Sequence, residues 1–126
     1  MKWLAVGLAA AALLARGQAQ DRSPAPPGNA EAGKTAYVKN GCYECHGYEG
    51  QGAPWLGGPR IGPDPMPFPR FLAYVRAPTG DMPAYAAKAL PDAQLADIHA
   101  YLRARPRPPA VNTIPLLSSQ AAPRRP

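Results

Sequence analysis

Five consecutive residues, Cys42-Tyr43-Glu44-Cys45-His46, constrain this chain more than any other stretch. They form the pattern C-x-x-C-H, which is typical of the covalent attachment of a c-type haem. Two cysteines three apart on a helical turn lie on the same side, so both thiols reach one porphyrin edge and form thioethers there. The histidine that follows is placed to bind the iron as its proximal ligand. We therefore expect Cys42, Cys45 and His46 to hold one haem c.

Two other sites are compatible with these residues taken alone. A redox-active C-x-x-C pair of the thioredoxin type requires a βαβ setting, and no stretch of the chain reads as a parallel-sheet unit. A zinc site would take Cys42, Cys45, His46 and His99 as its four ligands, although the adjacent pair Cys45 and His46 suits tetrahedral closure poorly. The chain has only two cysteines, so a haem attached to both leaves none for a structural disulfide.

Residues 1–19 predict a secretory signal peptide. A basic start at Lys2 precedes an apolar run over residues 3–15, and Gly17 and Ala19 supply the small residues that suit a cleavage site. The apolar run is shorter than the roughly 20 residues that a bilayer-spanning helix needs. We expect cleavage after residue 19, with an uncleaved membrane anchor as the alternative.

Proline-rich stretches flank a short folded part. Residues 20–28 predict a flexible lead-in, and residues 106–126 predict a disordered tail rich in proline and arginine. The domain between them, residues 29–105, has fewer than 80 residues. A core of that size is rarely stable without a covalent cross-link or a bound metal or cofactor. We expect the covalent haem to provide this stabilisation and to supply much of the apolar core.

The net charge of +6 is carried mainly by the ends of the chain. Between residues 21 and 102 seven Lys or Arg residues face eight Asp or Glu residues, whereas five arginines lie from Arg103 onward. A nearly neutral body argues against nucleic acid as a partner. The basic tail has the charge for a weak contact with anionic lipid or with an acidic partner, and a solvated tail that aids solubility is the alternative.

Three stretches predict helices, at residues 29–41, 67–76 and about 92–104. Asn29 is a good N-cap residue for the first, and Gly41 favours its end. The other two carry apolar residues at helical spacing. These apolar positions are Phe68, Phe71, Leu72, Val75, Leu95, Ile98 and Leu102. Between the first two helices, glycine and proline alternate over residues 47–69 and predict a long loop.

Taken together, these motifs resemble the mono-haem class I cytochromes c, small c-type cytochromes of the bacterial periplasm. The resemblance covers about residues 29–105. It rests on the C-x-x-C-H motif, the stretch G-P-R-I at residues 58–61, the stretch G-D-M-P at residues 80–83 and the pattern L-x-x-I-x-x-Y-L at residues 95–102. It implies an all-α fold of three to four helices wrapped around one covalent haem, with long Gly/Pro loops.

The resemblance also implies the remaining site residues. The carbonyl of Pro59 accepts a hydrogen bond from the non-ligating nitrogen of His46, which orients the ring. Met82 is the second axial ligand, and its thioether raises the reduction potential. Met66, which also lies in a proline-rich loop, is the competing methionine. An open or histidine-ligated sixth position is a further alternative.

Supporting roles follow from the same resemblance. Gly33 allows the first helix to cross the last one closely, with Tyr101 placed over it. Trp55, Leu56 and Ile61 are expected to cover the proximal side of the haem. His99 lies off the apolar stripe of the last helix, so we expect it at the surface.

The function implied is one-electron transfer between periplasmic redox proteins, a donor and an acceptor, without enzymatic activity. An iron bound by His46 and Met82 has no free position for a substrate. Ala53, Ala84 and Tyr85 are expected to rim the exposed haem edge where a partner docks. A monomeric carrier is one reading, and the haem subunit of a periplasmic dehydrogenase complex is the alternative. A five-coordinate haem that acts as a peroxidase or binds a gas is a third.

Overall fold

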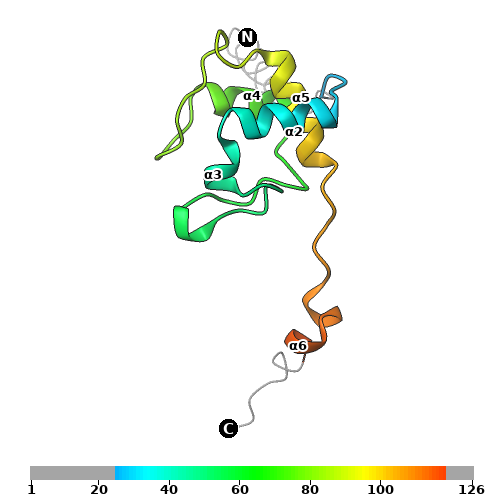
Figure 1. Cartoon of the computed structure of the whole chain (residues 1–126). Coiled ribbons are helices and arrows are strands. Elements are labelled where there is room, and N and C mark those ends of the chain that lie inside the picture. Colours follow the sequence, from blue (N-terminus) through cyan, green and yellow to red (C-terminus); the bar gives the residue numbers. More distant parts are fainter. Residues whose placement is uncertain (1–24, 119–126) are drawn as a thin grey trace, which may run out of the picture.

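The computed structural model describes residues 25–118, which form a helical body with an extended tail (Figure 1). The α-helices are α2 (Ala30–Lys39), α3 (Cys42–His46), α4 (Phe68–Arg76), α5 (Asp92–Arg103) and α6 (Pro115–Ser118). Two 3-10 helices accompany them, η1 (Pro54–Leu56) and η2 (Val111–Thr113). The described residues contain no strand, only an isolated bridge between Ala53 and Gly58. The all-α prediction is therefore confirmed, with four α-helices in the body. The predicted signal peptide lies outside the described residues.

Helices α2 and α5 cross at Gly33. Asn29 caps α2 with its side chain, which accepts hydrogen bonds from the backbone of Glu31 at 2.9 Å and Ala32 at 3.0 Å. A Cβ atom at Gly33 would lie 2.0 Å from the carbonyl oxygen of Asp97 in α5, so only glycine permits this approach. The close crossing was predicted. The Tyr101 ring packs on that of Tyr37, with 5.5 Å between the centroids.

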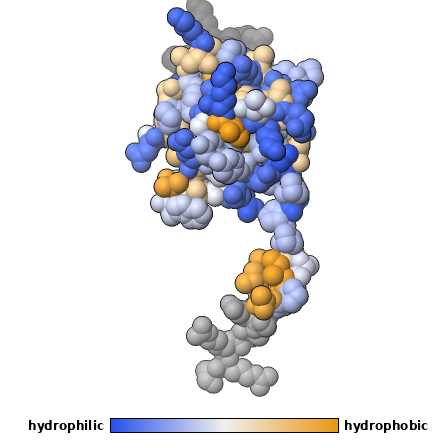
Figure 2. Space-filling model, viewed as in Figure 1, coloured by the Kyte–Doolittle hydropathy of each residue, from blue (hydrophilic) through white to orange (hydrophobic). Residues whose placement is uncertain are grey.

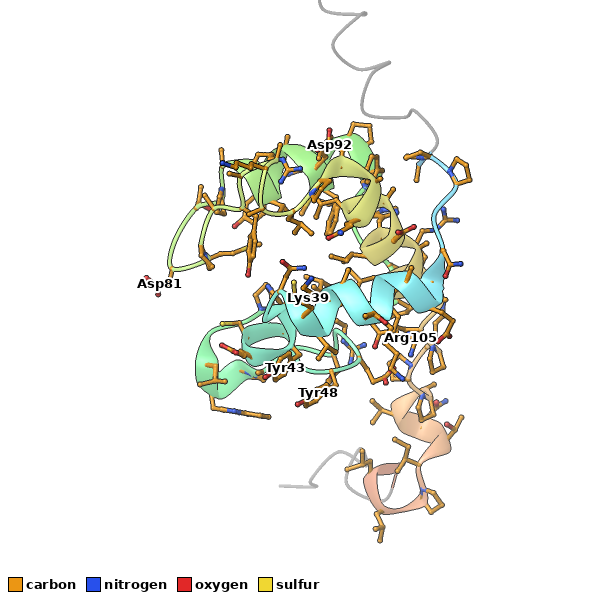
Figure 3. The ribbon with its side chains drawn as sticks, turned by 45° about the horizontal axis from the view of Figure 1, so that its top comes forward. Lys39, Tyr43, Tyr48, Asp81, Asp92 and Arg105 are labelled. Carbon is orange, nitrogen blue, oxygen red and sulfur yellow. The ribbon has the colours of Figure 1, made fainter. Side chains whose placement is uncertain are left out.

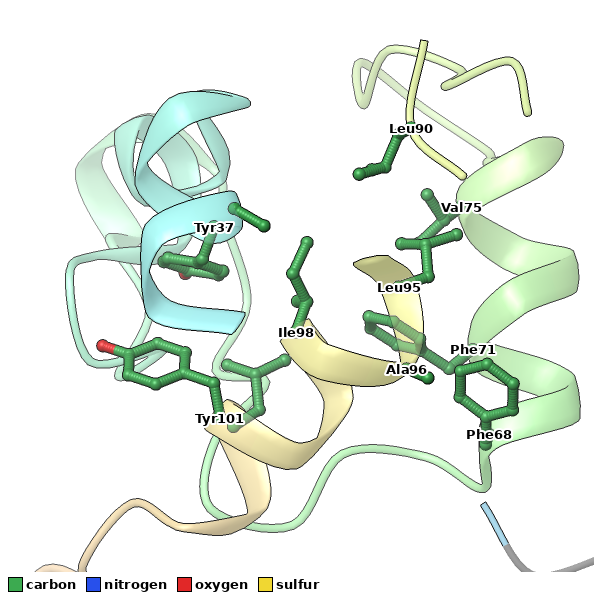
Figure 4. Packing of buried hydrophobic residues seen from close by; sticks show 11 residues of the cluster. Tyr37, Phe68, Phe71, Val75, Leu90, Leu95, Ala96, Ile98 and Tyr101 are labelled. Atoms are coloured by element: carbon green, nitrogen blue, oxygen red, sulfur yellow. The ribbon is translucent and has the colours of Figure 1, made fainter. Parts of the chain in front are cut away.

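The core lies on both sides of α5, which sits between α2 and α4 (Figure 4). The aromatic pair of Tyr37 and Tyr101 lies on the α2 side, and α4 contributes Phe68, Phe71 and Val75 from the other. Because both faces of α5 are covered, its buried residues extend beyond one apolar stripe. They are Leu95, Ala96, Ile98, His99, Tyr101 and Leu102.

The prediction that His99 is a surface residue was wrong. The side chain is 4% exposed and lies against the rings of Phe68 and Phe71 at centroid distances of 5.5 and 5.4 Å. Its Nε2 donates to the carbonyl oxygen of Met66 at 3.0 Å. The prediction missed the second buried face of α5, which only the packing of α4 creates.

The described parts of the two flanking segments contain some ordered contacts and short helices. In the lead-in, Ala25 packs on the core, and a Cβ atom at Gly28 would lie 2.4 Å from the carbonyl oxygen of Ala96. In the tail, residues 111–118 form η2 and α6, which extend away from the body (Figure 1). Proline at the first position of α6 suits a helix start. Within residues 25–118, no helix has both the length and the apolar character needed to cross a bilayer.

Candidate haem site

The C-x-x-C-H motif forms a helix of its own between two glycines. Gly41 and Gly47 flank α3 with φ angles of 73° and 74°, a backbone region that favours glycine. Cys42 is partly buried and Cys45 is exposed, and neither forms a disulfide. Burial raises the pKa of the Cys42 thiol to about 11, so this thiol stays protonated at neutral pH.

His46 is held in the orientation that a metal ligand requires. The residue is 8% exposed, and its Nδ1 lies 2.8 Å from the carbonyl oxygen of Pro59. Because a carbonyl only accepts hydrogen bonds, Nδ1 carries the proton and the lone pair remains on Nε2. Metal-binding histidines show this arrangement, with one nitrogen bonded to a backbone carbonyl and the other coordinating. The donor set therefore fits an iron ligand.

The loop after α3 is wrapped tightly enough to bring Pro59 to His46. A Cβ atom at Gly58 would lie 1.7 Å from the carbonyl oxygen of Cys45, so the loop backbone packs directly on α3. The amide of Gly52 donates to the carbonyl of His46 at 2.8 Å. Gly58 is thus required by its close backbone contact with the motif.

Three tyrosine hydroxyls hold the backbone on either side of α3. Tyr85 donates to the carbonyl of Asn40 at 2.8 Å, just before the motif. Tyr37 donates to Gly47 at 2.8 Å and Tyr101 donates to Tyr48 at 2.6 Å, just after it. Burial raises the pKa of all three phenols, so each remains a donor at neutral pH. These hydrogen bonds to the backbone around α3 were not predicted from the sequence.

Met82 lies in the loop between α4 and α5. It is partly buried and packs on the hydrophobic core, as do Cys42 and Tyr85, so the core connects the C-x-x-C-H helix with this loop. Met66 is also partly buried against the core, and its backbone carbonyl is tied to His99.

The residues expected around the haem differ in their exposure. Trp55 and Leu56 in η1 are 82% and 59% exposed. The bridge between Ala53 and Gly58 closes the chain at the base of η1, which projects outward. Ala53, predicted at an exposed rim, is buried. An aromatic pair that we did not predict, Tyr43 and Tyr48, stacks beside α3 at 4.5 Å between centroids (Figure 3).

The side chains of a zinc site are not gathered in the described part of the chain. Between residues 25 and 118, no group of three or more His, Cys, Asp or Glu side chains is close enough to hold a metal ion. The hydrogen bond of His99 to Met66 directs its ring toward the loop before α4. This arrangement argues against the four-ligand alternative.

Comparison with known proteins adds one finding. Residues 28–102 match the model of the family described as cytochrome c oxidase, cbb3-type, subunit III. No curated protein and no solved structure gives a significant match to the chain.

Proposed function

Because the chain belongs to the c-type cytochrome family described as cytochrome c oxidase, cbb3-type, subunit III, we propose that it carries single electrons on one haem c with His/Met ligation. Members of such a family hold haem covalently and transfer electrons. The observation that best supports this function is the hydrogen bond of 2.8 Å between His46 and Pro59, which prepares Nε2 for iron. We propose that the protein works in the periplasm.

Each site residue has a distinct role in this proposal. Cys42 and Cys45 would hold the haem as thioethers, His46 and Met82 would be the protein ligands of its iron, and Pro59 orients His46. When bound, the haem would supply cycling between Fe(III) and Fe(II). With both ligands in place no site would remain for a substrate, so the proposed function is electron carriage without catalysis.

Two methionines of the described chain provide the test of ligation. Iron–methionine bonding produces a charge-transfer band at the red end of the ferric absorption spectrum. We expect Met82→Ala to abolish this band and to lower the reduction potential, because a soft thioether favours ferrous iron. Met66→Ala is the matched control and should retain the band. Loss of the band in Met66→Ala, with retention in Met82→Ala, would show that the ligand is assigned wrongly.

The proposed partners are a redox protein that donates electrons and one that accepts them, and we propose no role for nucleic acid. The haem edge beside α3 is the proposed contact region. Ala84 is exposed there, and Tyr85 is partly exposed with its hydroxyl turned to Asn40.

A second candidate is a fixed subunit of a larger redox complex. The family description names an oxidase subunit, and hydrophobic side chains are exposed on the tail, apart from the body (Figure 2). Val111 is 61% exposed and Leu117 42% exposed. Purification from the native source separates the two candidates, because a subunit leaves the column with a larger redox enzyme and a free carrier leaves it as a monomer.

A further inference from the structure

The loop that carries Met82 is anchored at its base by Arg76, the last residue of α4. One terminal nitrogen, Nη1, donates to the carbonyl of Tyr85 at 2.7 Å. The other, Nη2, donates to the carbonyl of Leu90 at 2.7 Å and also pairs with the carboxylate of Asp92. The planar, forked guanidinium supplies several donors in fixed directions. Arg76 therefore ties the returning half of the loop to the end of α4.

Tyr85 ties the same loop to the C-x-x-C-H helix. Its amide donates to the carbonyl of Val75 at 3.1 Å, and its hydroxyl donates to the carbonyl of Asn40 at 2.8 Å. Asn40 is two residues before Cys42. A single residue therefore connects the loop of one proposed iron ligand with the helix that carries the other.

Among the described residues, the loop between these anchors has a further side-chain contact at Thr79, whose hydroxyl lies 3.1 Å from that of Tyr74. Gly80 and Asp81 then form a turn, and a Cβ atom at Gly80 would meet nothing within 4 Å. Asp81 lies at the tip of the loop, away from the helices (Figure 3). Met82 is three residues from Tyr85, so the first firm attachment after the methionine is the one that Arg76 and Tyr85 make.

We propose that Arg76 and Tyr85 are positioning residues that keep the Met82 thioether on the iron. They act through the backbone of the loop and need not touch the haem. The inference rests on the proposed function, because it takes Met82 as the axial ligand. When the anchor is weakened, the loop leaves the iron more often while the helical body stays folded.

Carbon monoxide measures this opening in the reduced, haem-loaded, full-length protein, since it binds ferrous iron only when the methionine has left. Tyr85→Phe removes only the hydroxyl bond to Asn40. Loss of one such hydrogen bond should raise the rate of carbon monoxide binding about fivefold. In the ferric protein, the charge-transfer band should disappear at a lower denaturant concentration than the helical circular dichroism signal.

Thr35→Val is the matched control. It also deletes one hydroxyl that donates to a backbone carbonyl, that of Glu31 at 3.3 Å, but this hydroxyl lies on α2, outside the Met82 loop and the haem motif. We expect its rate of carbon monoxide binding to equal that of the unsubstituted protein. Arg76→Lys is the second test variant, because lysine keeps the charge beside Asp92 but lacks the fork that reaches two carbonyls. It should raise the rate of carbon monoxide binding as Tyr85→Phe does. If Tyr85→Phe fails to load haem, Arg76→Lys is compared with the control instead.

Met82→Ala separates failure of this inference from failure of the proposed function. If Met82→Ala keeps the charge-transfer band, the ligand assignment itself is wrong. If Met82→Ala loses the band and binds carbon monoxide rapidly, while Tyr85→Phe and Arg76→Lys match Thr35→Val, the ligand is correct and the anchor is refuted.

Discussion

Two buried histidines in this protein use opposite ring nitrogens. His46 donates from Nδ1 to the carbonyl of Pro59, and His99 donates from Nε2 to the carbonyl of Met66. His46 is thereby left with its lone pair on Nε2, at the end of the ring that projects furthest. His99 is instead enclosed by Phe68 and Phe71. The two histidines therefore differ in role although they are the same residue type. The hydrogen-bond partner of one ring nitrogen determines which nitrogen carries the proton.

At this residue scale, His99 should make stability depend on pH. Burial lowers its pKa below the ordinary value of about 6.5, because the charged ring loses hydration. The stabilisation is fully present above that unfolded-state value and is lost as the pH falls toward the lower folded-state pKa. We expect the free energy of unfolding to decrease over this window, at most about 1.4 kcal/mol per pH unit.

Chemical denaturation of the haem-loaded protein at several pH values between 5 and 8 measures this dependence. His99→Gln is the control, because its amide is able to donate to Met66 without titrating. The difference in free energy of unfolding between the unsubstituted protein and His99→Gln should shrink or reverse at low pH. A constant difference across the range would contradict the expected titration of His99.

At the scale of elements, the crossing of α2 over α5 positions the start of the haem motif. Gly33 at the crossing lets the two backbones come together. Asn29 reinforces the contact, because its backbone N–H donates a hydrogen bond to the Asp97 carboxylate at 2.7 Å. The same pair of helices presents Tyr37 and Tyr101 to the carbonyls after α3. Separation of the helices would therefore disturb the support of the motif as well as the core.

We expect Gly33→Ala to reduce the free energy of unfolding by about 2 kcal/mol. Overpacking against a backbone costs up to about 3 kcal/mol, and the better helix propensity of alanine recovers about 1 kcal/mol. Lys34→Ala, at an exposed position of the same helix, should change stability by no more than about 0.5 kcal/mol. Guanidinium titrations of both variants provide the measurement. Equal stability of the two variants would mean that the helices separate without cost.

At the scale of the whole molecule, few of the interactions within residues 25–118 join the body to the tail. Arg107 makes two hydrogen bonds to the carboxylate of Asp64, at 2.6 and 2.7 Å, where the tail leaves the body. Both side chains are largely exposed, at 74% and 64%. Beyond this ion pair, η2 and α6 extend away from the helical body (Figure 1). The described part of the tail therefore contributes little to the stability of the helical body.

A chain that ends at Arg105 should retain its spectrum and lose less than about 1 kcal/mol of unfolding free energy, because exposed ion pairs contribute little. Arg107→Gln in the full chain should reproduce most of that loss, and high salt should remove the difference between the variants. Thermal unfolding in low and high salt is the measurement. A loss of several kcal/mol on truncation would show that the tail belongs to the folded body.

The sequence by itself determined the features that depend on neighbouring residues. The spacing of the C-x-x-C-H motif, the Asn29 cap and the apolar repeat of α4 are local, and the expected helices agree with the observed ones to within a residue or two. The bond of His46 to Pro59 was also expected, but from the family resemblance and not from spacing alone.

Only the tertiary structure decided the contacts between distant parts of the chain. The hydroxyls of Tyr85 and Tyr101 reach carbonyls 45 and 53 residues away, and His99 is bonded to a carbonyl 33 residues away. Their acceptors are backbone oxygens, which every residue possesses, so no residue type in the sequence marks them. The burial of His99 and the anchoring of the Met82 loop by Arg76 depend on how α4 and α5 pack, and they became visible only when that packing was known.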